Sequence, residues 1–131
     1  MTFSYDPAQL ERWNGRFSAE GYLFGTEPNA FLASQRDWLK PGMRALCVAD
    51  GDGRNSVWLA RQGLQVTAFD FSPVGVQKAR RLASDAGVAV DHRQCDIYRW
   101  YWSEASHDEM VAEGSAHRGR SALIDLVALR S

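Results

Sequence analysis

The stretch Arg44-Ala45-Leu46-Cys47-Val48-Ala49-Asp50-Gly51-Asp52-Gly53-Arg54-Asn55 decides the fold of this chain. An apolar run, typical of a buried strand, leads directly into a Gly-x-Gly turn and then into the start of a helix. Because glycine has no Cβ, such a turn lets a ligand approach the backbone N–H groups closely. The stretch therefore predicts a nucleoside cofactor, although an ordinary strand-to-helix turn has the same pattern.

Length and composition limit the classes of protein. The chain has 131 residues, with 15 basic and 16 acidic side chains, which predicts one domain and gives no basic surface for nucleic acid or an anionic membrane. No apolar stretch is long enough for a bilayer, and residues 1–6 lack the layout of a signal peptide, so we expect a cytoplasmic protein. Cys47 and Cys95 are expected to be small buried residues in a reducing compartment, and no structural metal is expected.

Strands and helices alternate through the middle of the chain. We expect strands at 44–49, 65–69 and 88–94, and helices at 55–62 and 73–86, the second helix with Ser72 as N-cap and Gly87 as its stop. Right-handed crossovers between parallel strands give the sheet order three, two, one. The predicted fold class is α/β, a Rossmann-like three-layer sandwich with a truncated parallel sheet and a C-terminal antiparallel hairpin.

The N-terminal region precedes this alternation. Residues 1–29 form an aromatic, turn-rich arm that we interpret as a lid or as a clasp that fastens the chain to its core. A helix is expected from Asn29 to Leu39, with Phe31, Leu32, Trp38 and Leu39 facing inward.

Three loops follow the carboxyl ends of the three parallel strands, which is where open α/β sheets bind ligands. They are Asp50 to Gly53, Asp70-Phe71 and Asp96-Ile97. Asp70 stands 19 residues after Gly51, close to the spacing at which an acid accepts hydrogen bonds from a ribose. Phe71 is suited to pack on a base, while Asp96 and the amide of Ile97 suit the edge of adenine. Each acid has an alternative role as a solvated loop residue or an N-cap.

The turn itself favours one cofactor over another. The third glycine of a dinucleotide fingerprint is replaced by Ser56, and Asp50 and Asp52 would repel a pyrophosphate. Acidic residues suit a cofactor with an amino group and a sulfonium, because opposite charges attract. The sequence therefore predicts S-adenosylmethionine.

With these motifs, residues 13–100 resemble class I S-adenosylmethionine-dependent methyltransferases, most closely the tellurite-resistance and thiopurine-type group. The matching segments are 22–32, 48–60 and 67–73. The resemblance implies that the turn passes the methionine portion and the ribose, that Asp70 holds the ribose hydroxyls, and that the segment from residue 22 to 29 covers the cofactor. The cofactor-binding residues expected on this basis are Tyr22, Phe24, Gly25, Pro28, Asp50, Gly51, Gly53, Asn55, Asp70, Phe71, Ser72, Asp96 and Ile97.

The chain departs from the family pattern in two ways. Cys47 and Ala49 stand where the wider class has an acid and a glycine. In addition, residues 113–128 resemble the family's carboxyl-terminal hairpin but follow the third strand several dozen residues sooner than in the family. This spacing predicts that the fourth and fifth strands of the family's sheet are absent. We therefore expect a single reduced methyltransferase domain over residues 1–131, divided into an arm (1–29), a cofactor-binding half (30–97) and a C-terminal hairpin (98–131).

This shortening exposes the edge of the first strand, and long apolar edges invite a second chain. Either the hairpin pairs directly against the first strand, or two chains complete each other's sheet. We predict a homodimer, with strand exchange as one form of it.

The predicted reaction is methyl transfer to a small-molecule or oxyanion acceptor. His117 is the candidate base, since its ordinary pKa suits proton removal near neutrality. Arg118 and Arg120 suit an anionic acceptor, although a solvated turn explains them as well. The alternatives are a cofactor-binding module without catalysis and, disfavoured by Ser56, a nicotinamide-dependent enzyme.

Overall fold

A computed structural model describes residues 6–96, 111–112 and 126–130 of the chain. Five strands form one sheet in the order β3-β2-β1-β5-β4. The strands are β1 (Arg44–Val48), β2 (Gln65–Asp70), β3 (Asp91–Gln94), β4 (Val111–Ala112) and β5 (Leu126–Arg130). The helices are α1 (Pro7–Phe17), α2 (Ala30–Ser34), the 3₁₀ turn η1 (Arg36–Trp38), α3 (Arg54–Arg61) and α4 (Pro73–Ala86).

The three strands β1, β2 and β3 are parallel, which confirms the α/β fold and its parallel three-stranded sheet. On the other side of β1, β5 runs antiparallel to it with Cys47 opposite Val127, and β4 pairs antiparallel with β5. The free edge that the sequence predicts for the first strand is therefore paired within this one chain.

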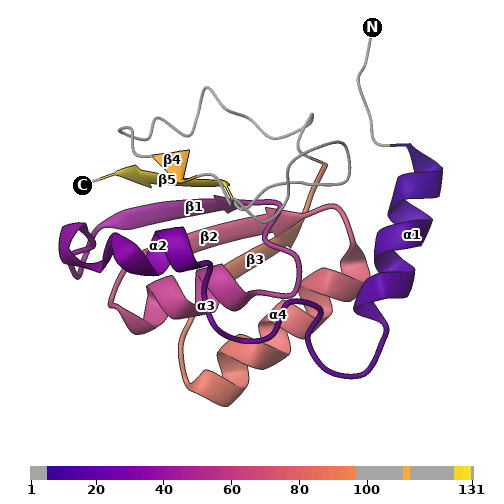
Figure 1. Ribbon diagram of the computed structural model, residues 1–131, viewed down its shortest axis with the longest axis horizontal. Coiled ribbons are helices and arrows are strands. Elements are labelled where there is room, and N and C mark those ends of the chain that lie inside the picture. Colours follow the sequence, from indigo (N-terminus) through magenta and orange to yellow (C-terminus); the bar gives the residue numbers. More distant parts are fainter. Residues whose placement is uncertain (1–5, 97–110, 113–125, 131) are drawn as a thin grey trace, which may run out of the picture.

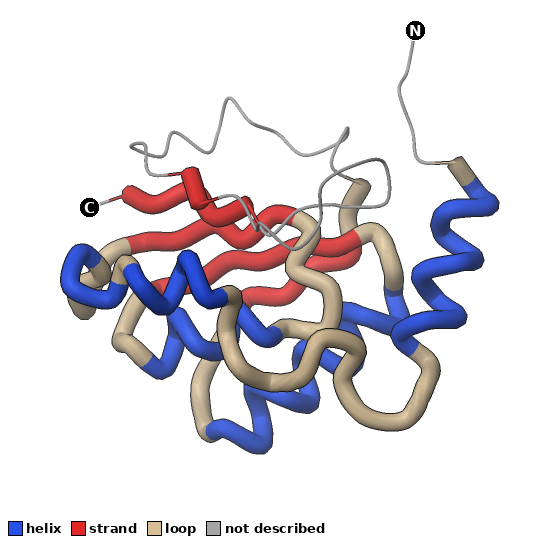
Figure 2. Tube along the Cα trace, in the orientation of Figure 1, coloured by secondary structure: helices blue, strands red, loops and turns tan. Residues whose placement is uncertain are grey.

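Helices α2, α3 and α4 lie along one side of the sheet (Figure 1, Figure 2). Alternate strand residues point to this side, where they share a core with the helices; its strand members are Ala45, Cys47, Val66 and Ala68. The intervening residues Leu46, Val48 and Phe69 form a second buried cluster on the opposite face. The third layer of the predicted sandwich lies outside the described residues.

Local signals explain where the helices begin. The side chain of Ser72 accepts a hydrogen bond from the N–H of Gly75 (3.1 Å) at the start of α4, and Gly87 ends that helix in the left-handed conformation with φ 71°. Asp6 caps α1 in the same way by accepting from the N–H of Ala8 (2.9 Å), with a proline directly after the cap.

Two expectations about the N-terminal third are wrong. The arm contains a regular helix, α1, where the sequence suggested only turns. The expected helix from Asn29 to Leu39 is instead the short α2 followed by η1; Leu32 and Leu39 are buried as expected, whereas Phe31 and Trp38 have 45% and 70% of their surface exposed. A separate difference concerns the third strand. The sequence predicts it at residues 88–94, whereas β3 begins only at Asp91.

Candidate cofactor site

The glycine turn links β1 to α3 and has an unusual backbone. Ala49, Gly51 and Gly53 all have positive φ, at 55°, 60° and 99°. A Cβ at Gly53 would lie 2.8 Å from the Cβ of Ala79 on α4, so only glycine lets these two helices approach. Gly51 is also closely packed, because a Cβ there would lie 3.1 Å from the ring of Phe17.

Asp70, the acid that ends β2, joins two of the predicted loops. One carboxylate oxygen accepts the N–H of Gly51 (3.1 Å), and the other accepts the N–H of Ser72 (3.0 Å). Burial raises the pKa of Asp70 from 3.8 to about 7, although these two backbone hydrogen bonds act in the opposite direction. Each oxygen keeps a second lone pair, so the carboxylate still has the capacity to accept ribose hydroxyls.

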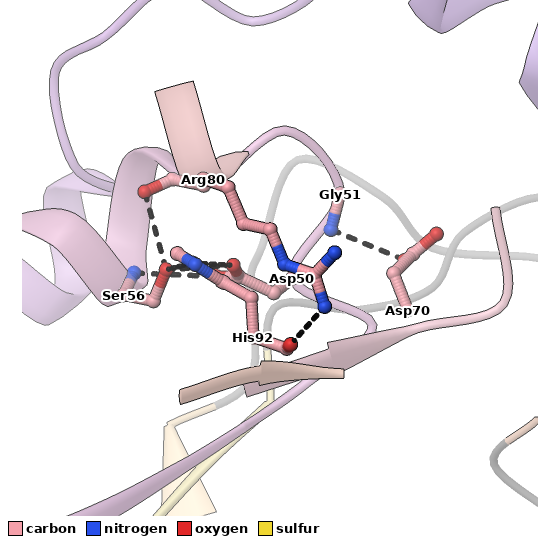
Figure 3. A network of polar contacts seen from close by, with 7 residues as sticks. Asp50, Gly51, Ser56, Asp70, Arg80 and His92 are labelled. Carbon is pink, nitrogen blue, oxygen red and sulfur yellow. Dashed lines mark hydrogen bonds and ion pairs between the residues drawn. The ribbon is translucent and has the colours of Figure 1, made fainter. Parts of the chain in front are cut away.

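Asp50 faces into the fold rather than along the turn (Figure 3). Its two carboxylate oxygens accept the N–H (3.2 Å) and the Oγ–H (2.6 Å) of Ser56, and Nε2 of His92 lies 3.5 Å away. Burial raises the pKa of Asp50 above its ordinary value, against the opposing effect of its His92 and Ser56 hydrogen bonds. The side chain that we expected to meet the cofactor's positive charge is thus engaged inside the domain.

His92 is the residue of this region that sequence reasoning missed, since it was expected at the surface. Only 5% of it is exposed. The signal is the alternation of β3 and the residues before it: Val88, Val90 and His92 fall on one face, and Val90 packs against the core. A histidine that continues an apolar alternation is expected to be buried.

The segment of residues 22–29, hereafter the cover segment, is bound to the turn and to α3. The N–H of Leu23 donates to Asp52 (2.8 Å), and the N–H of Asn29 donates to the side-chain oxygen of Asn55 (2.8 Å). Burial also raises the pKa of Asp52, although the Leu23 amide opposes this. Asp52 and Asn55 therefore bind backbone N–H groups of the cover segment and fasten it to the turn and to α3.

Cations on the domain hold the aromatic residues of the cover segment. The ammonium of Lys78 lies 5.1 Å from the ring centre of Tyr22, and the guanidinium of Arg54 lies 5.3 Å from that of Phe24. Lys78 also donates to the carbonyl oxygens of Ala19 (3.0 Å) and Gly21. Gly25, with φ 78°, is exposed and Pro28 is partly buried.

Helix α1 also contributes to the site. The ring of Phe17 lies 3.1 Å from the position that a Cβ on Gly51 would take and 3.0 Å from that of Gly75. Next to it, Asn14 accepts a hydrogen bond from the hydroxyl of Ser72 (2.5 Å). The clasp interpretation of the arm therefore has a physical basis, since α1 packs on the glycine turn and on the start of α4.

The third loop is described only in part. Asp96 is buried and Phe71 is partly buried, and the N–H of Cys95 donates to the carbonyl oxygen of Asp70 (2.9 Å), which ties the second and third loops together. Ile97 lies outside the described residues, as do the acceptor-side candidates His117, Arg118 and Arg120.

Loops from three parallel strands, gathered at the carboxyl edge of the sheet around a glycine turn and a buried acid, define a Rossmann-like cofactor-binding protein. The sequence profile of the methyltransferase domain family matches residues 45–128, and the chain belongs to this family.

Individual relatives agree with this assignment. The chain is 35% identical over 71 residues to a ubiquinone biosynthesis O-methyltransferase of Methylocella silvestris, an alignment that covers 54% of this chain and 28% of the relative. It is 34% identical over 101 residues to a ribosomal protein L11 methyltransferase of Symbiobacterium thermophilum, covering 73% of this chain and 30% of the relative. The chain thus spans less than a third of the length of these relatives.

A solved structure shares the fold. A SAM-dependent methyltransferase from Geobacter sulfurreducens, crystallised in complex with S-adenosyl-L-homocysteine, matches 71% of this chain and 38% of its own with a TM-score of 0.52 at 21% identity. The family supports S-adenosylmethionine as the cofactor, as the sequence predicts.

The described residues hold neither a membrane-spanning helix nor a metal-binding cluster. Residues 6–96 and the described parts of the C-terminal region contain no helix with the length and apolar character needed to cross a bilayer. Within the same residues, no three His, Cys, Asp or Glu side chains are grouped so that they could share a metal ion.

Proposed function

We propose that this chain binds S-adenosylmethionine at the glycine turn and transfers its methyl group to a small molecule or an oxyanion. The observation that carries the proposal is the link between Gly51 and Asp70 at the carboxyl ends of β1 and β2. This hydrogen bond holds the Asp70 carboxylate beside the turn, where its remaining lone pairs are placed to accept the ribose hydroxyls of an adenosyl ligand.

The residues present fit such a ligand. Asp70 would hold the ribose hydroxyls through its free lone pairs, and Phe71, Asp96 and Ile97 would surround the base. Gly51 supplies backbone without a Cβ at the turn. The cover segment, with Tyr22, Phe24, Gly25 and Pro28, would close over the methionine portion; Gly53, Asn55 and Ser72 support this arrangement by shaping the turn and the start of α4.

S-adenosylmethionine supplies an activated methyl group on a sulfonium, which the acceptor attacks in line while the sulfur keeps the bonding electron pair. The protein then contributes proximity and alignment. An acceptor that carries a proton must release it, and we propose His117 as the base for this step. We propose Arg118 and Arg120 as the groups that hold an anionic acceptor.

A binding module without catalysis is the second candidate. The observation that favours it is length: the chain spans less than a third of the curated relatives it matches.

Calorimetric titration with S-adenosylmethionine and S-adenosylhomocysteine tests the cofactor, and an assay of S-adenosylhomocysteine formation over a panel of phenols, thiols and oxyanions tests catalysis. Binding together with turnover supports the methyltransferase. Binding without turnover on any acceptor supports the module, and the absence of binding to both ligands contradicts both candidates.

We further propose that the domain is a reduced, cytoplasmic member of the tellurite-resistance and thiopurine-type group, with sheet order three, two, one and a C-terminal hairpin, acting as a homodimer. The pairing of β5 with β1 supports the reduced sheet. Light scattering after gel filtration tests the dimer, and a mass of one chain at micromolar concentration would contradict it.

A further inference from the structure

A buried polar network lies behind the glycine turn and has no assigned role (Figure 3). It consists of Asp50, Ser56 and His92, with 7%, 0% and 5% of their surface exposed. They come from the turn, from α3 and from β3, so the network joins three elements. Because buried polar groups are costly unless hydrogen-bonded, an arrangement of this kind fixes the geometry of all its members.

The protons of the network can be assigned from its distances. The Ser56 hydroxyl has one proton, and its 2.6 Å contact with Asp50 takes that proton, whereas its contact with the carbonyl of Gly53 is longer at 3.4 Å. The 3.0 Å contact between Ser56 and His92 must therefore be donated by Nε2–H of the imidazole. His92 is then the neutral Nε2–H tautomer, with a lone pair on Nδ1.

Nδ1 is buried and has no hydrogen-bond partner among the residues that the structure describes. A proton there would be an unsatisfied buried donor, which disfavours the other neutral tautomer. The backbone of β3 is also held at this position, because Arg80 on α4 donates to the main-chain carbonyl oxygen of His92 (2.8 Å). The donor on Nε2 therefore points at Ser56 from a fixed strand.

The network leads directly to the backbone of the turn. Asp50 receives the Gly53 N–H on its carbonyl oxygen (3.2 Å) and donates its own N–H to Phe69 of β2 (3.0 Å). The next residue is Gly51, whose N–H is bound to Asp70. Any rotation of the Asp50 side chain away from Ser56 would consequently disturb the turn backbone and the hydrogen bond between Gly51 and Asp70.

We propose that His92 is a positioning residue for cofactor binding: its Nε2–H holds Ser56, Ser56 holds Asp50, and Asp50 holds the glycine turn in the conformation in which Gly51 binds Asp70. The inference rests on the proposed function, since it concerns the same site. His92 itself stays behind the turn, and its contribution passes through Ser56 and Asp50.

Two substitutions separate the hydrogen bond from the volume of the ring. His92→Gln keeps an N–H donor at a position similar to that of Nε2, whereas His92→Leu keeps an apolar side chain but removes the donor. Val66 lies in the core near the start of β2, at the end of the strand away from Asp70. Val66→Ala is therefore the matched control for a loss of stability that does not involve the network. Dissociation constants for S-adenosylhomocysteine are measured by calorimetry, with thermal unfolding recorded for each variant.

We expect His92→Leu to weaken binding about tenfold, as removal of a partner from a buried polar group does, and His92→Gln to stay within about threefold of the wild type. Val66→Ala should lower the unfolding temperature and leave the dissociation constant unchanged. Equal weakening by Leu and Gln, or none by Leu, would overturn the positioning role.

A second measurement needs no ligand and therefore separates this inference from the proposed function. In the free protein, amide hydrogen exchange at Ser56 and Gly51 should be faster in His92→Leu than in His92→Gln or Val66→Ala, because the Ser56 amide is bound by the Asp50 carboxylate and Gly51 directly follows Asp50 in the turn. Equal exchange in all three variants would overturn the inference. If wild-type protein fails to bind S-adenosylhomocysteine while this difference is present, the proposed function fails and the positioning of the turn stands.

Discussion

Ala49 has the one positive φ of a non-glycine residue among the residues the structure describes, at 55°. It stands where the wider family has a glycine, and a Cβ in the left-handed region costs about 1–2 kcal/mol. Since a glycine also loses more entropy on folding, we expect Ala49→Gly to raise the free energy of unfolding by about 0.5–1 kcal/mol.

Denaturant unfolding measures this difference. Ala45→Gly is the matched control, because Ala45 lies in the regular part of β1 and is buried, so the same change should destabilise the domain there. A loss of stability in Ala49→Gly equal to that in Ala45→Gly would show that the turn does not strain Ala49.

Asp70 makes stability depend on pH. Its pKa is raised by burial from 3.8 to about 7, so between these values the folded state binds more protons than the unfolded state, and its contribution to stability falls as pH rises. Relative to Asp70→Asn, which does not titrate, the wild type should lose about 2–3 kcal/mol of unfolding free energy between about pH 5 and pH 8.

Chemical unfolding at a series of pH values gives this difference. Asp91→Asn, the same substitution at an exposed carboxylate at the start of β3, is the control for the exchange of Asp for Asn itself. A constant difference between wild type and Asp70→Asn across this range would mean that Asp70 titrates as an ordinary acid.

At the scale of elements, the contact between α3 and α4 depends on Gly53. A Cβ there would lie 2.8 Å and 2.9 Å from the Cβ and Cα of Ala79, and φ is 99°, so both space and backbone conformation exclude a side chain. We expect Gly53→Ala to destabilise the domain by about 3 kcal/mol or more, because overpacking and backbone strain add.

Gly25→Ala separates these two effects. Gly25 also has a positive φ, 78°, but nothing lies within 4 Å of its Cβ position, so only the conformational cost of about 1 kcal/mol remains. Thermal unfolding of both variants measures the difference. Equal losses would mean that α4 moves aside without cost and that the helix contact does not select glycine.

The elements predictable from the sequence are those with local signals at both ends. Helix α4 has Ser72 and Pro73 at its start and Gly87 at its end, and β1 and β2 are continuous apolar runs. No local signal predicts the pairing of β5 with β1. The sequence is equally compatible with a hairpin that pairs with β1 and with a second chain that covers the same edge. Contacts between segments that are far apart in the sequence decide which strand pairs with β1.

The errors near the N-terminus have a physical cause as well. Asp6 and Pro7 are an N-cap and first-turn pair, and Trp13 and Phe17 have helical spacing, but the glycines that follow obscured this signal. In the site, Asp70 was found from its spacing, whereas the role of Asp50 depends on His92, which is 42 residues away along the chain. Side-chain networks between elements are not visible in a motif.

At the scale of the whole molecule, the described residues form one connected frame around the turn. Helix α1 packs against Gly51 from one side through Phe17, the cover segment is bound to Asp52, and β3 holds the turn from behind through His92. A ligand at this place would contact parts of the chain that are far apart in sequence. Its binding should therefore stabilise the domain as a unit.

This linkage gives a prediction for the intact chain. S-adenosylhomocysteine at about one hundred times its dissociation constant should add about 2.7 kcal/mol to the free energy of unfolding, which for a domain of this size corresponds to an increase of about 10 °C in the unfolding temperature. NADH is the control, because Ser56 takes the place of the third glycine of a dinucleotide turn and its hydroxyl is bound to Asp50. Thermal scans with each ligand measure both shifts. A shift with NADH and none with S-adenosylhomocysteine would reverse the choice of cofactor, since only the ligand that binds the folded chain can move its unfolding equilibrium.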